Sequence, residues 1–221
     1  MSYPALQNAA AYRRLFPFLH LIMRFVMRCF APRLRITGKH NVPFRGAVLL
    51  TPNHTSDGDP PFLYVALRRA AWYMAKRELW IGYPTLGAFM DRVQTFPVDR
   101  DNMDRAALQT ALDLLARGEV LVVFPEGKIS PTGELAALEA GAVMLAIKSG
   151  APVVPVGIVG STRVLPYQQT RPRFTLGRVR VHFGPPLTFA DLATLPRREQ
   201  RRLAMERLET ALRDAVRVAS G

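Results

Sequence analysis

The sequence predicts one α/β domain with a mixed, largely parallel β-sheet flanked by helices and preceded by an N-terminal amphipathic, membrane-seated helix. Short apolar runs alternate along the chain with segments of helical periodicity, which is typical of sheets with crossover helices. The chain has 221 residues, enough for one core without disulfide or metal cross-links. It contains no repeat, low-complexity tract or linker long enough to divide that core.

The N-terminal part differs from the rest in its charge. The whole chain has 30 Lys and Arg against 17 Asp and Glu, a formal net charge of +13. Asp57 is the first acidic residue, and the eight basic residues before it are Arg13, Arg14, Arg24, Arg28, Arg33, Arg35, Lys39 and Arg45. A basic flank beside apolar sequence favours an anionic membrane surface as a partner. We therefore expect a membrane-interface helical segment at residues 1–35 and the α/β domain at residues 36–221.

Residues 15–30 are apolar but carry His20, Arg24 and Arg28 at intervals of four. A helix collects these three side chains in one stripe, and Pro17 fits its first turn. A complete membrane span is disfavoured, because each central arginine costs about 2.5–3.5 kcal/mol. A broad apolar face with a cationic stripe is typical of a helix in the membrane interface. The alternative is an ordinary core helix whose arginine stems lie along apolar surface.

The first half of the α/β domain is predicted to contain three strands and two helices. The apolar run at residues 46–51 predicts a buried strand, and residues 72–75 and 95–98 predict two more extended segments. Between the first two strands a helix begins at Asp59, which is a good N-cap followed by a first-turn proline. Residues 79–90 predict a second helix with an internal proline.

The second half continues the alternation. Helices are predicted at residues 103–116 and 139–149, each followed by a glycine that can end it, and a long amphipathic helix at 196–218. Apolar runs predict strands at 120–124 and 153–159. In a half-buried strand at 178–183, Val179, Val181 and Phe183 should point inward, and Arg178, Arg180 and His182 outward.

Several kinds of chemistry lack their local signatures. The chain has no phosphate-binding P-loop motif, no G-x-G-x-x-G, no G-x-S-x-G nucleophile elbow and no H-E-x-x-H. Its single cysteine, Cys29, excludes an internal disulfide and a cysteine-rich zinc site. We expect neither a metal nor a cofactor.

His54 and Asp59 are the candidate acid–base pair. They follow the strand predicted at 46–51, and ligand sites of α/β proteins lie beyond the carboxyl ends of strands. An imidazole takes a proton near neutral pH when a carboxylate fixes its tautomer and stabilises the imidazolium. The alternative for Asp59 is a helix cap without a catalytic role.

Two further segments place a cation beyond a predicted strand. Arg100 follows the strand at 95–98, and Lys128 follows the strand at 120–124 after Gly127, which allows a close backbone approach. Arginine binds phosphate in bidentate fashion and lysine binds it as a point charge. The alternative for each is a solvated loop charge.

Four blocks in order resemble the glycerophospholipid acyltransferase family of lysophosphatidate type. They are Asn53-His54-x4-Asp59, Pro97-Val98-Asp99-Arg100, Phe124-Pro125-Glu126-Gly127 and Val154-Pro155-Val156, and the resemblance covers residues 36–186. It implies acyl transfer from a thioester of coenzyme A or acyl carrier protein to lysophosphatidic acid, giving phosphatidic acid. It implies His54 as general base, Asp59 as its partner and Arg100 as the phosphate ligand. Glu126 and Gly127 would shape the acceptor pocket, and residues 154–156 would line or support the acyl site.

The third block departs from the family pattern. Many members continue it as Glu-Gly-Thr-Arg-Ser, whereas this chain has Glu126-Gly127-Lys128-Ile129-Ser130. Either Lys128 supplies the missing cation, or the acceptor is another lysolipid, such as lysophosphatidylethanolamine or a lyso-ornithine lipid. The family also implies a peripheral or monotopic enzyme, which we expect on the cytoplasmic face of the cell membrane.

Two other classes of protein compete with this interpretation. A nucleic-acid-binding domain would explain the positive charge but predicts aromatic residues on a basic face, whereas the aromatics here lie mostly in apolar runs. A catalytically inactive membrane-binding scaffold would not need both His54 and Asp59. We expect no nucleic-acid partner.

Overall fold

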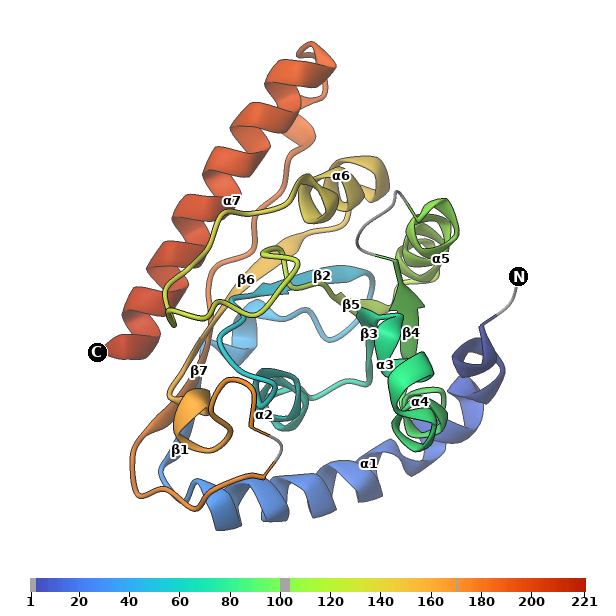
Figure 1. Ribbon diagram of the computed structural model, residues 1–221. Coiled ribbons are helices and arrows are strands. Elements are labelled where there is room, and N and C mark those ends of the chain that lie inside the picture. Colours follow the sequence, from blue (N-terminus) through green and yellow to red (C-terminus); the bar gives the residue numbers. More distant parts are fainter. Residues whose placement is uncertain (1–2, 100–103, 170) are drawn as a thin grey trace.

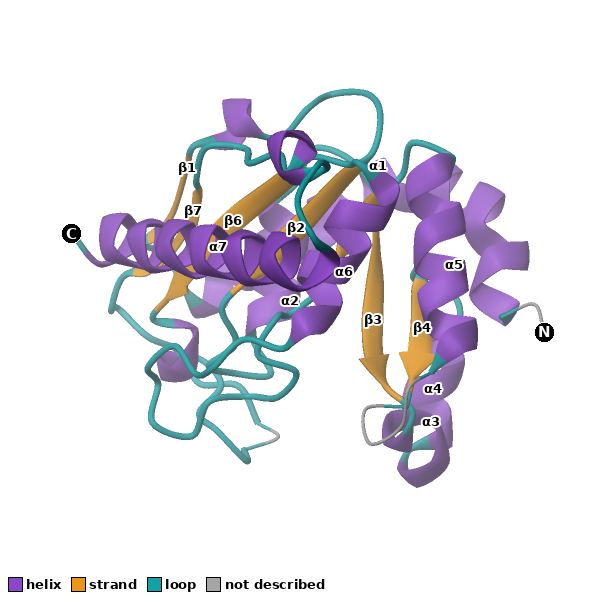
Figure 2. Ribbon diagram, turned by 90° about the horizontal axis from the view of Figure 1, so that it is seen from above, coloured by secondary structure: helices purple, strands orange, loops and turns teal. Residues whose placement is uncertain are grey.

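Apolar β-branched and leucine runs form the centre of the sheet, as the hydropathy pattern predicts. The computed structural model describes residues 3–99, 104–169 and 171–221. The strands, in chain order, are β1 (Leu34–Thr37), β2 (Val48–Pro52), β3 (Ala71–Lys76), β4 (Thr95–Val98), β5 (Val120–Val122), β6 (Val153–Val159) and β7 (Val179–Phe183). They form one seven-stranded sheet in the order β1-β7-β6-β2-β5-β3-β4 (Figures 1 and 2). The sheet is parallel except between β6 and β7, so the predicted mixed, largely parallel α/β class is confirmed.

Helices cover both faces of the sheet. The helices are α1 (Pro4–Phe30), α2 (Asp59–Ala66), α3 (Glu78–Gly82), α4 (Pro84–Met90), α5 (Arg105–Ala116), α6 (Ala140–Ser149) and α7 (Arg197–Ser220). On one face α5, α6 and α7 lie side by side, and on the other α1 crosses α2 (Figure 1). The pair α3–α4 extends beyond the ends of β3 and β4 (Figure 2).

Alternate residues of the central strands divide the core into two layers. Leu49 of β2 and Leu121 of β5 pack in the layer of α5, α6 and α7. Their neighbours Val48, Leu50 and Val122 pack with α2 and the C-terminal part of α1. Because both sides of each strand are buried, the strands are continuously apolar, as is typical of a parallel sheet.

Helix α1 is longer than predicted. It begins at Pro4, so Pro17 lies in its interior and not in the first turn, which corrects our prediction. The three side chains that were predicted to share one stripe, His20, Arg24 and Arg28, also differ in their exposure. Arg24 and Arg28 are exposed, whereas His20 is partly buried, with its ring 5.7 Å from that of Tyr64. Burial lowers the pKa of His20, and Arg24 lowers it further.

One face of α1 packs on the domain while the other carries exposed apolar side chains. These are Leu15, Phe18, Leu21, Ile22 and Phe25, which are between 45% and 69% exposed. Within the described parts of the chain, no helix is both long enough and apolar enough to cross a membrane. The structure therefore contains elements of both alternatives for this segment: a helix packed against the core and an apolar outer face.

Two elements differ from the sequence prediction. The helix predicted at residues 79–90 is broken into α3 and α4, with Pro84 as the first residue of α4. Proline fits a first turn but disrupts a helix interior, which agrees with the break before Pro84. Pro17, by contrast, lies inside the continuous helix α1. Strand β1 was not predicted. The expected division between residues 35 and 36 falls inside it, where Arg35 pairs with Arg180 and Ile36 with Val181 of β7.

Candidate active site

Two loops meet at the carboxyl edge of the parallel sheet. Strands β2 and β5 are parallel neighbours, so the segments that follow them emerge side by side. The main chain of His54 is held from both directions by the second loop. Its N–H donates to Glu126 Oε1 (2.6 Å), and its carbonyl accepts from the Ser130 N–H (2.8 Å). The first and third sequence blocks thus form one site, as their positions after strands predict.

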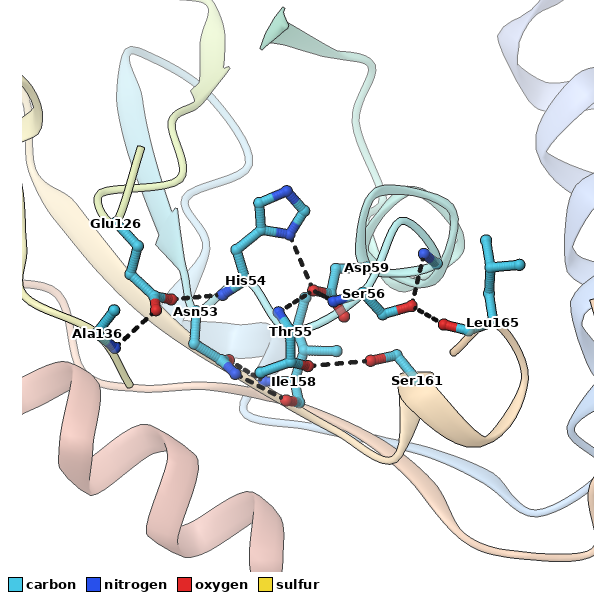
Figure 3. A network of polar contacts seen from close by, with 11 residues as sticks. Asn53, His54, Thr55, Ser56, Asp59, Glu126, Ala136, Ile158, Ser161 and Leu165 are labelled. Atoms are coloured by element: carbon cyan, nitrogen blue, oxygen red, sulfur yellow. Dashed lines mark hydrogen bonds and ion pairs between the residues drawn. The ribbon is translucent and has the colours of Figure 1, made fainter. Parts of the chain in front are cut away.

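The imidazole of His54 and the carboxylate of Asp59 form the predicted pair. His54 Nδ1 lies 3.0 Å from Asp59 Oδ2, and the two side chains are 9% and 0% exposed (Figure 3). Since a carboxylate accepts hydrogen bonds, Nδ1 is the donor, and in the neutral imidazole Nε2 then has a free lone pair. The ring points away from the polar network in Figure 3. This geometry suits a base that takes a proton at Nε2.

The carboxylate of Asp59 organises the turn before α2 and does not cap the helix. Asp59 Oδ2 also accepts from the N–H groups of Thr55 (2.7 Å) and Ser56 (2.9 Å). Gly58, not Asp59, occupies the N-cap position, which corrects our assignment of the cap. The only bonds of the carboxylate to described residues are those at Oδ2, because Oδ1 is buried without a partner there.

Side chains tie this turn to strand β6 and the loop that follows it. The Asn53 amide exchanges two hydrogen bonds with the main chain of Ile158, at 3.0 and 2.6 Å, and so extends the pairing of β2 with β6. Ser56 Oγ accepts from Gly58 N and donates to the Leu165 carbonyl (Figure 3). The His54–Asp59 pair therefore lies on a turn that is fixed at both ends.

Glu126 lies behind His54 and both of its oxygens are occupied. Oε1 accepts from His54 N and Oε2 from Ala136 N (2.8 Å). Burial raises the pKa of Glu126 above its ordinary value, although the two N–H donors oppose that shift. Its carboxylate thus supports the main chain of His54, and direct contact with the acceptor stays a prediction.

Phe124 and Ser130 are contacts of His54 that sequence reasoning missed. The rings of Phe124 and His54 lie 4.0 Å apart, centroid to centroid, with 30° between their planes. Both residues belong to the Phe124–Ser130 segment that signalled the third block, but nothing local indicates that they touch His54. A flat partner on one side limits rotation of the imidazole.

The remaining residues of this loop are less enclosed. Gly127 has φ +68°, a left-handed conformation that suits glycine, and an added Cβ would lie 3.2 Å from Glu139 Cγ. Lys128 is exposed and Ile129 is partly buried. Arg100, the predicted phosphate ligand, lies outside the described residues.

Val154, Pro155 and Val156 are buried in the middle of β6. The two valines are 0% exposed and pack in the core layer of α2. Thr51 and Pro52 of β2 pair with Pro155 and Val156, next to the start of the His54 turn. This position favours support of the site over direct lining of an acyl pocket, and the lining role stays a prediction.

Comparison with known proteins agrees with this geometry. The family model described as Acyltransferase matches residues 33–159. A protein of Bacillus subtilis named 1-acyl-sn-glycerol-3-phosphate acyltransferase is 30% identical over 182 residues, which cover 82% of this chain and 87% of the relative. A chloroplastic protein of that name from Arabidopsis thaliana, LPAT1, is 27% identical over 61% of this chain and 38% of its own length.

A solved structure has the same fold. The crystal structure of the acyltransferase PlsC from Thermotoga maritima superposes with a TM-score of 0.70, covering 93% of this chain and 82% of the other, at 22% identity. The family model spans more than half of the chain and includes the segments of both His54 and Glu126. From the fold, the site and the matched region together, we conclude that this chain belongs to the acyltransferase family.

Proposed function

We propose that the protein transfers a fatty acyl group from a thioester donor, acyl-CoA or acyl-acyl carrier protein, to the free hydroxyl of lysophosphatidic acid, giving phosphatidic acid. The observation that carries this proposal is the buried His54–Asp59 pair, with Nδ1 3.0 Å from a carboxylate oxygen that two further N–H groups hold in place. The names of the relatives in Bacillus and Arabidopsis support the choice of acceptor.

In the proposed reaction His54 acts as general base. Nε2 takes the proton of the acceptor hydroxyl as its oxygen attacks the thioester carbonyl carbon. Asp59 stabilises the imidazolium through Nδ1–H. The tetrahedral intermediate then collapses, the carbon–sulfur bond breaks, and the leaving thiolate takes the proton from Nε2. No covalent acyl-enzyme is needed.

The acceptor phosphate requires cations near the catalytic pair. We assign this role to Arg100, beyond β4, with Lys128 on the loop that holds His54. Lys128 is exposed and forms no ion pair with the described residues, so its charge is available to a ligand. Ile129 occupies the usual arginine position, and this favours a second candidate acceptor with less negative charge, lysophosphatidylethanolamine or a lyso-ornithine lipid.

A lipid acceptor requires contact with a membrane, and three exposed apolar segments support it. Besides α1, they are α3–α4, with Ile81, Tyr83 and Phe89, and the loop after β6, with Phe174 and Leu176. Helix α1 is hydrogen-bonded to the neighbourhood of each of the other two segments. The Asn8 side chain donates to the Asp91 carbonyl next to α4, and Thr175 N donates to the Phe30 carbonyl. We propose peripheral or monotopic attachment at the cytoplasmic face of the cell membrane.

The test is an assay of the purified full chain with a panel of acceptors and donors. Lysophosphatidic acid, lysophosphatidylethanolamine and a lyso-ornithine lipid are each combined with acyl-CoA and acyl-acyl carrier protein. We expect free thiol and phosphatidic acid to form at equal rates with lysophosphatidic acid. A higher kcat/KM for another lysolipid would replace the acceptor, and no transfer to any lysolipid would refute the proposal.

A further inference from the structure

A group of cations gathers at the sheet edge opposite His54. Strand β1 runs antiparallel to β2, so Lys39, which follows β1, lies at the edge where β2 begins. Helix α2 begins beside His54 and returns to the same edge, where it ends next to Arg68. Its eight residues span about 12 Å, so this group does not belong to the catalytic pair.

Lys39 lines a surface depression. The side chains around it include Phe44, Leu67, Arg68 and Phe183, and we call this feature the Lys39 pocket. Gly38 fixes the turn that presents Lys39. Its φ is +72°, and a Cβ there would lie 2.0 Å from the Phe183 carbonyl oxygen. The position of the lysine is therefore set by the backbone.

The charge of Lys39 has no counter-ion in the described part of the chain. Lys39 is partly buried, and neither a carboxylate nor a hydrogen-bond acceptor from the described residues contacts it. Burial lowers its pKa, and repulsion by Arg24, Arg68 and Arg28 lowers it further. Four cations thus converge from α1, the turn after β1 and the end of α2, an arrangement that an anion would stabilise.

The neighbouring Arg69 has a structural role, because its guanidinium is hydrogen-bonded to the main chain. Its guanidinium donates to the carbonyl oxygens of Pro43, Gly46 and Gly118, at 2.9–3.0 Å, and so holds the chain around the pocket. Arg68 makes no such bonds to the residues that the structure describes, and its guanidinium carbon lies 5.5 Å from the centroid of the Phe44 ring. Among the described residues nothing accepts a hydrogen bond from the charged groups of Lys39 and Arg68, so their donors are left for a ligand, whereas three of the five N–H donors of Arg69 are engaged with main-chain carbonyls.

We propose that the Lys39 pocket binds the headgroup phosphate of an anionic phospholipid in the membrane surface. A lysine–arginine pair suits a phosphate oxyanion. Exposed apolar side chains favour a lipid over a free phosphate: Phe44, which lines the pocket, is 67% exposed, and Leu21 and Phe25, on the same helix as Arg24 and Arg28, are 66% and 69% exposed. This site does not depend on the transfer reaction, and it anchors the face that α1 shares with the membrane.

The first experiment measures binding of the full chain to phosphatidylcholine vesicles with and without phosphatidylglycerol, a lipid that is neither acceptor nor product. The variant is Lys39→Gln with Arg68→Gln. The matched control is Arg33→Gln with Arg35→Gln, two exposed cations from the same acid-free region. We expect the pocket variant to lose about thirtyfold in affinity for phosphatidylglycerol vesicles, since each cation near an anionic surface contributes on the order of fivefold. Its binding to pure phosphatidylcholine should not change.

Equal losses for the two double variants would mean a diffuse basic surface and would overturn the proposal. The inactive variant His54→Ala should bind these vesicles as the unmodified protein does, so failure of this site and failure of the proposed reaction are distinguishable.

A second experiment uses the unmodified protein and so does not depend on the folding of a variant. Reductive methylation of Lys39 should slow on phosphatidylglycerol vesicles, while Lys148, on α6 in the opposite layer, reacts at an unchanged rate. No protection of Lys39 would refute the site. Equal protection by inorganic phosphate without vesicles would refute the assignment to a lipid.

Discussion

The carboxylate of Glu126 accepts a hydrogen bond from the main-chain N–H of His54 at 2.6 Å, across 72 residues of sequence. In the same loop, the N–H of Ser130 donates a hydrogen bond to the His54 carbonyl. The main chain of His54, the proposed base, is therefore held by a carboxylate that need not touch the substrate. This relationship suggests tests that separate positioning of the base from binding of the acceptor.

Glu126→Gln should lower kcat while leaving the acceptor KM nearly unchanged. A glutamine side chain has one acceptor oxygen, so it cannot satisfy both His54 N and Ala136 N. Loss of alignment at the base should cost roughly ten- to a hundredfold in kcat. Steady-state kinetics check this, with Glu134→Gln, an exposed acid of the same loop, as control. A selective rise in the acceptor KM would instead mean direct binding by Glu126.

The same substitution should change how stability depends on pH. Burial raises the pKa of Glu126, so the folded state holds this proton to a higher pH than the unfolded state does. Its contribution to the free energy of unfolding is present below the ordinary glutamate pKa and is lost as pH rises through the raised value. The difference in unfolding free energy between the unmodified protein and Glu126→Gln should therefore decrease above that ordinary pKa. Denaturant titrations at several pH values measure it.

His54→Ala should abolish transfer in a folded protein. Removal of a general base typically costs about 10²–10⁴-fold in rate. His40→Ala is the matched control, because His40 is exposed and lies at the opposite sheet edge. Thermal melts should show that both variants fold. Retention of more than a tenth of the activity by His54→Ala would exclude this residue as the base.

Asp59→Asn tests the negative charge with little change in shape. The three hydrogen bonds to Asp59 all reach Oδ2, so an asparagine oxygen in that place can keep them. We expect near-normal stability and a loss in kcat on the order of 10²-fold or more, since the imidazolium loses its counter-charge. Asp57→Asn, an exposed carboxylate two residues away, should have no effect. An active Asp59→Asn would leave Asp59 with only a structural role in the turn.

Arg100→Ala should raise the KM for the lysolipid much more than the KM for the thioester, because a phosphate ligand acts on one substrate only. Lys128→Ala separates the two interpretations of the third block. A comparable rise in acceptor KM would mean that Lys128 replaces the usual arginine. Unchanged kinetics would make Lys128 a solvated charge and would favour the acceptor of lower charge.

Substitutions on the outer face of α1 should weaken membrane binding without unfolding the protein. Deletion of the helix is a poor test, because Tyr12 is buried and Phe16 packs on Tyr64 of α2. Phe18→Gln with Phe25→Gln changes only exposed side chains. We expect weaker binding to vesicles in high salt, where apolar contacts dominate over screened charges. Val218→Gln, an exposed apolar residue on α7, is the control, and unchanged binding by the α1 variant would exclude this face.

Local pattern was sufficient to predict six of the seven strands, all but β1, and the spacing of the His54–Asp59 pair. Hydrophobic runs placed β4 at residues 95–98 and β6 at residues 153–159 with their observed bounds. Alternation assigned Val179, Val181 and Phe183 of β7 to the buried side, as observed. His54 and Asp59 lie on one turn, so their contact depends on few backbone angles. These features come from interactions between near neighbours, which a sequence displays directly.

Tertiary structure decided which groups meet across the sheet. The bond of Glu126 to His54 exists because β5 happens to be the neighbour of β2, and no local signal in either segment encodes that order. Tertiary packing also decided which side chains of α1 are exposed to solvent. Helical spacing placed His20, Arg24 and Arg28 together, but packing against Tyr64 turned His20 inward and left the arginines in solvent. Periodicity specifies the faces of a helix, whereas the partner that covers one of them is set by the folded chain.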